Sequence, residues 1–280
     1  MKKALINKYL RPMTPLPTDL TARGELRANI NCILFDIYGT LFISGSGDIG
    51  IGQQNSPAHD EVKRLLAKYA LPQTPRGILD KLYDRIEIRH AVLRDNGVDF
   101  PEVIIEQIWR QVLEIDDQKI IKQFAVEFEL IANPVWAMPG LGSMLSACRQ
   151  KKMVTGIISN AQFYTPPLFN WFLNRDPEGL GFDPGLLFYS YQHEVAKPSP
   201  VLFKMAAEKL SSKGIHPVSV LYVGNDMLND IYPANACGFQ TALFAGDRRS
   251  LRLRTDDPRC QGLSPDLVLT DLEQLIAHIH

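Results

Sequence analysis

Four short stretches of the chain hold residue types that could carry out nucleophilic hydrolysis together. Each stretch follows an apolar run, and between them they supply a carboxylate, a hydroxyl group, a lysine and a pair of acids. A carboxylate can form a covalent intermediate, while hydroxyl and ammonium groups stabilise the negative charge that develops during the reaction. The residues concerned are Asp36, Ser159, Asn160, Lys197, Asp226 and Asp230.

The apolar runs before these residues predict strands buried on both faces, because the runs are short and bounded by turn residues. The predicted strands are 32–36, 153–159, 187–190 with its lead-in, 219–224, 239–244 and 266–269. Helical spacing of apolar residues predicts helices over 140–152, 199–214 and 227–238. Strands alternating with helices predict an α/β class, with a Rossmann-like parallel sheet and helices on both faces. The carboxyl ends of such strands share one edge, so we expect the side chains named above to gather there.

One interval interrupts the alternation of strands and helices. Between about Ser44 and Asn133, four amphipathic stretches place apolar residues three or four apart, and this pattern predicts an inserted all-helical cap domain. The Gly-rich and Pro-rich segments 44–52 and 132–140 are the expected linkers. The predicted organisation is an N-terminal extension, a Rossmann-like core and a helical cap. Their ranges are 1–30 for the extension, 31–44 with 134–280 for the core, and 45–133 for the cap.

Composition excludes several other kinds of protein. The 280 residues include 30 basic and 31 acidic side chains, and a net charge of -1 gives no reason to expect a nucleic-acid partner. The four cysteines form no CxxC pair, so we expect free thiols. No apolar run is long enough for a membrane span, and the first residues make a poor signal peptide. The expected protein is cytoplasmic, acts on a small molecule and has no membrane partner.

Taken together, the motifs resemble those of the haloacid dehalogenase-like (HAD) hydrolase superfamily, in its helical-cap (C1) branch. FDIYGTLF is similar to the first motif of that family, ISNA to the second, AKPSPVLF to the third and YVGNDMLNDIYPA to the fourth. The four occur in the family's order, and the resemblance covers nearly all of the chain after residue 31. It implies a Rossmann-like core with a cap that closes over the site.

The resemblance also implies roles for individual residues. Asp36 would be the nucleophile, Thr40 and Ser159 would donate hydrogen bonds to phosphoryl oxygens, and Lys197 would neutralise charge on both groups. Tyr38, Gly39 and Asn160 would contact the substrate. The implied cofactor is Mg²⁺. Its ligands would be Asp36, the backbone carbonyl of Tyr38, Asp226 and Asp230.

Two departures from the family's phosphatase pattern leave alternatives open. Tyr38 stands where many relatives carry a second aspartate, and a phenol is a poor acid–base group at neutral pH. Asn225 stands directly after the glycine of the fourth motif, where many relatives have aspartate, and Asp226 follows it. A divalent cation would relieve repulsion between Asp226, Asp230 and the nucleophile. The first expectation is therefore a Mg²⁺-dependent phosphatase of a small phosphate ester. The alternatives are a metal-independent 2-haloacid dehalogenase and a catalytically impaired binding protein.

Overall fold

The computed structural model describes residues 7–45 and 57–279, and its centre is a seven-stranded sheet. Every pairing in this sheet is parallel except that of β1 with β9. The sheet confirms the six predicted strands, and β2 lies between β7 and β5. In spatial order the strands are β1 (Arg23–Gly24), β9 (Leu267–Leu269), β8 (Gln240–Phe244), β7 (Val220–Gly224), β2 (Cys32–Phe35), β5 (Val154–Ser159) and β6 (Phe182–Tyr189).

Helices cover both faces of the sheet, as the α/β pattern predicts. Ile33 and Phe35 of β2 face α6, α7 and η4, whereas Cys32 and Leu34 face α10 and α11. This alternation follows from the two-residue period of a strand. The elements around the sheet are α6 (Leu141–Gln150), α7 (Pro167–Leu173), α8 (Pro177–Leu180), α9 (Ser190–His193), α10 (Val201–Ser212), η2 (Pro217–Ser219), η3 (Met227–Ile231), α11 (Tyr232–Ala236) and η4 (Leu272–His278).

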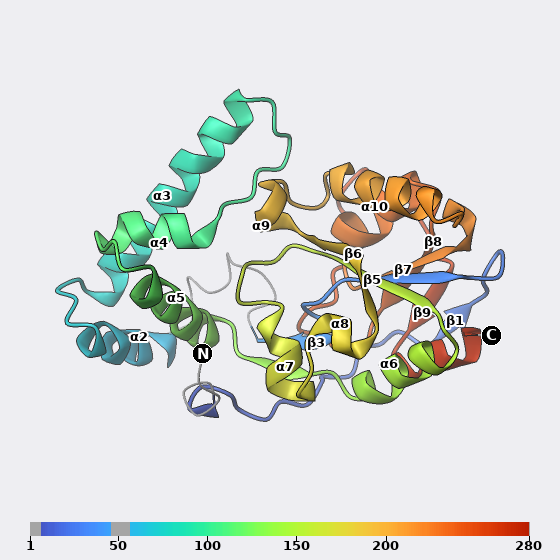
Figure 1. Cartoon of the computed structure of the whole chain (residues 1–280), viewed down its shortest axis with the longest axis horizontal. Helices are drawn as coiled ribbons and strands as arrows, with labels where there is room; N and C mark the ends of the chain where they lie inside the picture. The colour runs from blue at the N-terminus through green and yellow to red at the C-terminus, as the bar shows by residue number, and fades with distance from the viewer. Residues whose placement is uncertain (1–6, 46–56, 280) are drawn as a thin grey trace.

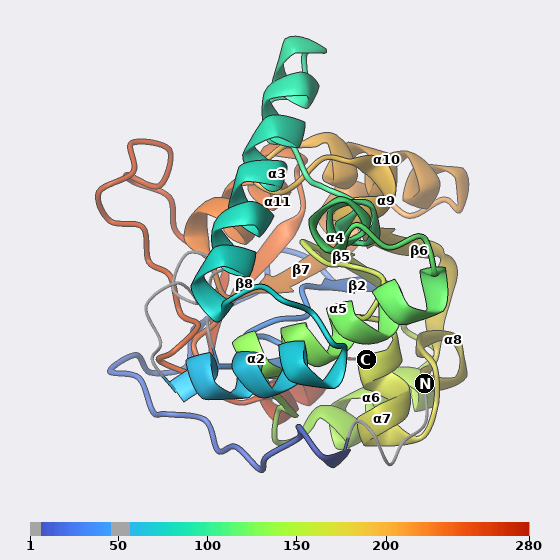
Figure 2. The same ribbon diagram turned by 90° about the vertical axis from the view of Figure 1, so that its left-hand side faces the viewer.

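A group of four helices stands apart from the sheet, on the left of Figure 1, and has its own apolar core. Trp109 of α4 packs edge-on against Phe124 and Phe128 of α5, with ring centroids 4.9 and 4.7 Å away. In Figure 2, α2 and α3 lie toward the viewer, in front of α5. The inserted helical cap is thus present. Its helices are α2 (Pro57–Lys68), α3 (Pro75–Asp95), α4 (Ile105–Leu113) and α5 (Gln118–Ala132).

A short antiparallel ribbon connects the helical group to the core. Its strands are β3 (Phe42–Ser44) and β4 (Val135–Ala137), which pair Ile43 with Trp136. The segment 132–140, expected to be a linker, therefore contains a strand. The sequence did not predict this strand, because three residues are too few to show a period. Most of the other expected linker, 44–52, lies outside the described residues.

The N-terminal segment 7–30 packs along both parts of the molecule. The Tyr9 hydroxyl donates a 2.5 Å hydrogen bond to Glu127 of α5. Farther along, the Leu16 amide donates to Asp247 and the Thr18 hydroxyl to the carbonyl of Ala245, both in the loop after β8. The segment therefore bridges the helical group and the core.

Cys32, Cys148, Cys237 and Cys260 are all free of disulfides, as their spacing predicts. Among the described residues, no helix has both the length and the apolar character needed to cross a bilayer.

Candidate active site

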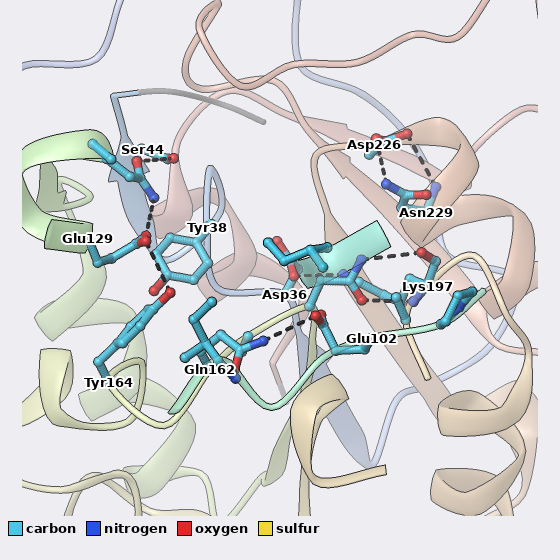
Figure 3. A pocket seen from close by; sticks show the side chains of 18 of the residues that line it. Asp36, Tyr38, Ser44, Glu102, Glu129, Gln162, Tyr164, Lys197, Asp226 and Asn229 are labelled. Carbon is cyan, nitrogen blue, oxygen red and sulfur yellow. Dashed lines mark hydrogen bonds and ion pairs between the residues drawn. The ribbon is translucent and has the colours of Figure 1, made fainter. Parts of the chain in front are cut away.

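The ends of β2 and β5 and the loop after β6 bring Asp36, Ser159 and Lys197 together, as Figure 3 shows for Asp36 and Lys197. Asp36 Oδ1 accepts hydrogen bonds from Ser159 Oγ at 2.9 Å and from Lys197 Nζ at 2.7 Å. No described residue donates a hydrogen bond to Oδ2, and Asp36 lines a cavity. One carboxylate oxygen is therefore fixed while the other can reach a substrate.

Lys197 is held at both its backbone and its side chain. Its amide donates to Asn160 Oδ1 at 2.7 Å, and Asn160 Nδ2 donates to its carbonyl at 3.2 Å. Its ammonium also contacts Asp230 Oδ1 at 2.5 Å and the Tyr222 hydroxyl at 3.2 Å. Burial lowers the pKa of Lys197, but the charges of Asp230 and Asp36 outweigh this effect and raise the pKa above its usual value. The lysine therefore remains a cation inside the protein.

A tight turn follows Asp36 and places Thr40 beside β7. Gly39 has a φ of +83°, and a Cβ there would lie 2.4 Å from the Cβ of Ser250, so only glycine suits this position. The Thr40 hydroxyl donates to Asn225 Oδ1 at 3.2 Å. Thr40 thus lies at the expected edge of the sheet, with its proton directed at Asn225.

Tyr38 points its ring into the region between core and cap (Figure 3). Its hydroxyl lies 3.0 Å from Thr165 Oγ1, and either atom can be the donor. Burial raises the pKa of Tyr38 well above the usual value for a phenol, and the charge of Glu129 adds to the effect. A phenol with so high a pKa is a poor proton donor to a leaving group.

The first acid of the fourth motif, Asp226, has both carboxylate oxygens engaged. Arg254 donates from Nη2 to Oδ2 at 2.7 Å and from Nε to Oδ1 at 3.1 Å. The amides of Leu228 and Asn229 donate to Oδ1, and Asn229 Nδ2 donates to Oδ2. A carboxylate offers about four lone-pair sites, so these contacts occupy it.

The second acid, Asp230, is buried behind the nucleophile. Besides Lys197, its Oδ1 accepts from Tyr222 at 3.1 Å, and its Oδ2 accepts from the amide of Asp226 at 2.9 Å. Gly224 permits this approach, since a Cβ there would lie 2.3 Å from Asp230 Cγ. Burial raises the pKa of Asp230, an effect that Lys197 opposes.

This arrangement does not fit the predicted magnesium site. The oxygens that Asp226 and Asp230 would offer a cation are bonded to Arg254, to Lys197 and to backbone amides. Within residues 7–45 and 57–279, no three His, Cys, Asp or Glu side chains are grouped as metal ligands.

A cavity of about 410 Å³ opens above these residues, between core and cap. Asp36, Asn160 and Lys197 lie at its base, together with Arg252 and Asn229. The cap contributes an apolar roof, and two carboxylic acids, Glu102 and Glu129, also line the cavity. The roof residues include Leu79, Leu82, Ile86, Trp109 and Phe128. The site can therefore enclose a small molecule that is polar at one end and apolar at the other.

Glu102 lines the same cavity and lies beside Gln162 (Figure 3). Its carboxylate accepts hydrogen bonds from Gln162 Nε2, the Val103 amide and the Ser190 hydroxyl, yet burial is the larger effect and raises its pKa to about 7.

We expect Glu102→Gln to change how stability depends on pH. The pKa of Glu102 is about 7 in the folded chain, against its ordinary value of 4.5. Between pH 4.5 and 7 the folded state therefore binds more protons than the unfolded state, and the protein loses stability as pH rises through this range. The variant lacks this loss, and relative to wild type it should gain about 2 to 3 kcal/mol between pH 4.5 and pH 8. Urea unfolding at both pH values measures the gain. Glu114→Gln, at an exposed carboxylate, is the control, and an equal difference at both pH values would contradict the prediction.

With this geometry in place, the comparisons with known proteins identify the class. The haloacid dehalogenase-like hydrolase family matches residues 30–238, which is most of the sequence. The chain belongs to the haloacid dehalogenase-like hydrolase family. A search of curated proteins found no match.

Solved structures of the same fold include dehalogenases and a phosphatase. A 2-haloacid dehalogenase from Pseudomonas syringae pv. Tomato DC3000 is 22% identical, with a TM-score of 0.55 over 89% of this chain and 97% of that one. The L-2-haloacid dehalogenase RSc1362 is 17% identical, with a TM-score of 0.52 over 90% and 99%. A HAD phosphatase from Thermococcus onnurineus is 16% identical, with a TM-score of 0.52 over 88% and 96%. At these identities the likeness establishes the fold alone.

Sequence reasoning missed several residues of the site, among them Tyr222, Glu102 and Arg254. Tyr222 is a polar side chain in the middle of an otherwise apolar strand, which was a usable signal. Glu102 gave none, because it precedes a helix as an ordinary charged residue. Arg254 lies 28 positions beyond Asp226 in a loop without periodicity, and only the folded chain brings the two together.

Proposed function

We propose that this protein is a hydrolase that uses Asp36 as a covalent nucleophile and needs no divalent cation. Its substrate is a small molecule whose leaving group departs as a stable anion, and a 2-halocarboxylic acid best meets that description. The observation that carries the proposal is the pairing of the acids around Asp36 with two cations of the chain itself, Lys197 and Arg254. Without nearby cations these carboxylates would repel one another and would favour a bound magnesium ion, but Lys197 and Arg254 offset that repulsion.

In the first step, Asp36 Oδ2 attacks the carbon that bears the halogen. A C–O bond forms while the C–halogen bond breaks, and the electron pair of that bond leaves with the halide. Because a halide needs no proton, the weak acidity of Tyr38 is no obstacle. Water then attacks the carboxyl carbon of Asp36 in the ester. This step releases the 2-hydroxy acid and a proton, and restores the carboxylate.

The cavity supports an acid with an apolar side chain as the substrate. Arg252 lines the cavity, and its Nη1 donates to the carbonyls of Arg249 and Leu251 at 2.7 and 3.0 Å, which orients the guanidinium. It forms no ion pair with a carboxylate in the described part of the chain, so we assign it to the substrate's carboxylate. The apolar roof from the cap suits the side chain.

We further assign 45–133 as the cap domain and 31–44 with 134–280 as the hydrolase core. The cavity lies between them, and α3 contributes Arg89, which pairs at 2.5 Å with Glu194 of the core. Closure of the cap would exclude water during the attack on carbon.

A second candidate is a magnesium-dependent phosphatase that acts on a small phosphorylated metabolite through an aspartyl-phosphate on Asp36. The spacing of Asp226 and Asp230 behind β7 favours it, as does Lys197 beside the nucleophile. The shared fold of the Thermococcus HAD phosphatase is compatible with it. In this case Asp226 would have to leave Arg254.

Halide and phosphate release, each measured with and without EDTA, separate the two candidates. The halide assay uses 2-chloropropionate and 2-chloro acids with longer apolar chains, and the phosphate assay uses a broad panel of phosphate esters with Mg²⁺. We expect halide release that EDTA leaves unchanged. Phosphate release that requires Mg²⁺, with no halide release, would overturn the proposal in favour of the second candidate.

A further inference from the structure

We propose that Arg254 takes the place of a divalent cation at Asp226, so that its removal would create a metal site in this chain. The inference rests on the proposed metal-independent function and deepens it by naming the residue responsible. Asp226 and Asp230 are predicted magnesium ligands, but their carboxylate oxygens are bonded to Arg254, to Lys197 and to backbone amides.

The fold fixes the position of Arg254 through the backbone. Asp226 and Arg252 form an isolated parallel bridge, in which the Met227 amide donates to the Arg252 carbonyl at 2.9 Å and the Arg252 amide to the Asn225 carbonyl at 3.0 Å. This bridge ties the loop after β8 to the fourth motif. Arg254 follows two residues later and reaches back to the carboxylate.

The Asp226–Arg254 pair is a strong contact. Arg254 spans both oxygens of Asp226, at 2.7 Å from Nη2 and 3.1 Å from Nε, and the carboxylate is 9% exposed. A forked, charge-assisted contact at a nearly buried carboxylate is among the stronger polar contacts in proteins. A metal ion would therefore have to displace a cation that the chain holds in place.

Arg254 also contributes positive charge to the site. Three carboxylates, Asp36, Asp226 and Asp230, lie at this end of the sheet. Among the residues that the structure describes, Lys197 would be the only cation left to pair with them without Arg254. A guanidinium supplies positive charge but accepts no ligand. It therefore neutralises Asp226 without performing the Lewis-acid role of a metal.

Binding of Mn²⁺, followed by electron paramagnetic resonance, tests the inference without any substrate. We expect wild type to bind Mn²⁺ weakly, and Arg254→Gln or Arg254→Ala to bind it with a Kd lower by at least about tenfold, because a paired carboxylate becomes available. Adding Asp226→Asn to either variant should abolish the gain. Arg259→Gln is the matched control, since Arg259 lies on the same loop and pairs with Asp257 instead, at 2.8 Å.

Two results would overturn the inference. In one, wild type itself binds Mn²⁺ tightly although Arg254 is in place. In the other, both Arg254 variants fold, as circular dichroism would show, yet bind no more Mn²⁺ than wild type. The second result combined with metal-independent halide release would leave the proposed function standing. A gain in Mn²⁺ binding without halide release would support the inference and reject the proposed substrate.

Discussion

Asp36→Asn is expected to lower turnover by a factor of about 10⁴ or more, because an amide cannot form the covalent ester. The substitution keeps the shape of the side chain and an oxygen that can accept from Ser159 and Lys197, so the variant should still fold. Asp183→Asn is a suitable control, since Asp183 pairs with Lys213 on the surface of the core. Steady-state halide release, or phosphate release for the second candidate, measures the effect.

Isotope labelling identifies the attacking atom in the same reaction. In a single turnover of a 2-chloro acid in H₂¹⁸O, one ¹⁸O atom should appear in the peptide that contains Asp36, while the 2-hydroxy acid takes its new oxygen from the protein. Label that enters the product directly would mean that water attacks the substrate itself. Wild type and Asp36→Asn that are equally inactive on every substrate would support the remaining reading, a binding protein of this fold.

Lys197→Met is expected to abolish activity and to destabilise the fold more than any surface substitution. The lysine side chain is 3% exposed and contacts carboxylates of Asp36 and Asp230, which the variant leaves facing each other without a cation. Removing one partner of a buried ion pair costs about 3 to 5 kcal/mol. Lys213→Met, at an ion pair whose lysine is 42% exposed, should cost less than about 1 kcal/mol.

The loss in Lys197→Met should depend on pH in a definite direction. Burial and the charge of Asp36 raise the pKa of Asp230, and Lys197 opposes both effects. With the lysine gone, the folded state therefore binds more protons at Asp230 than the unfolded chain does. Stability relative to wild type should recover as pH falls from 7.5 toward 5. Urea midpoints at the two pH values test this, and an equal deficit at both would show that lost packing, not charge, explains the effect.

The positions of most site residues could be predicted because the sheet's topology determines them. Asp36 and Ser159 follow strands that are parallel neighbours, so their side chains had to meet at one edge. Lys197 follows the next strand, and Asp230 comes shortly after β7, which lies on the other side of β2. Local patterns were sufficient here, because each residue's place depends only on the strand before it.

The electrostatic partners of these residues could not be predicted in the same way. Asp226 was predicted to be a metal ligand because Asp230, a second acid, lies four residues beyond it. This spacing carries no information about an arginine far along the chain. Arg254 reaches it from a loop whose course depends on the backbone bridge at Arg252. Such long-range contacts leave no periodic signal in the sequence. The β3–β4 ribbon was not predicted for a related reason, because its strands of three residues each are too short to show a period in the sequence.

The segment before the first strand has a consequence for the movement of the cap. Tyr9 is bonded to the cap at Glu127, and Leu16 is bonded to the core at Asp247. Seven residue steps of fully extended chain reach roughly 25 Å at most. While both hydrogen bonds hold, the length of this segment limits how far the cap can move away from the core. We therefore expect residues far from the reacting atoms to restrict how far the cap and the core can separate.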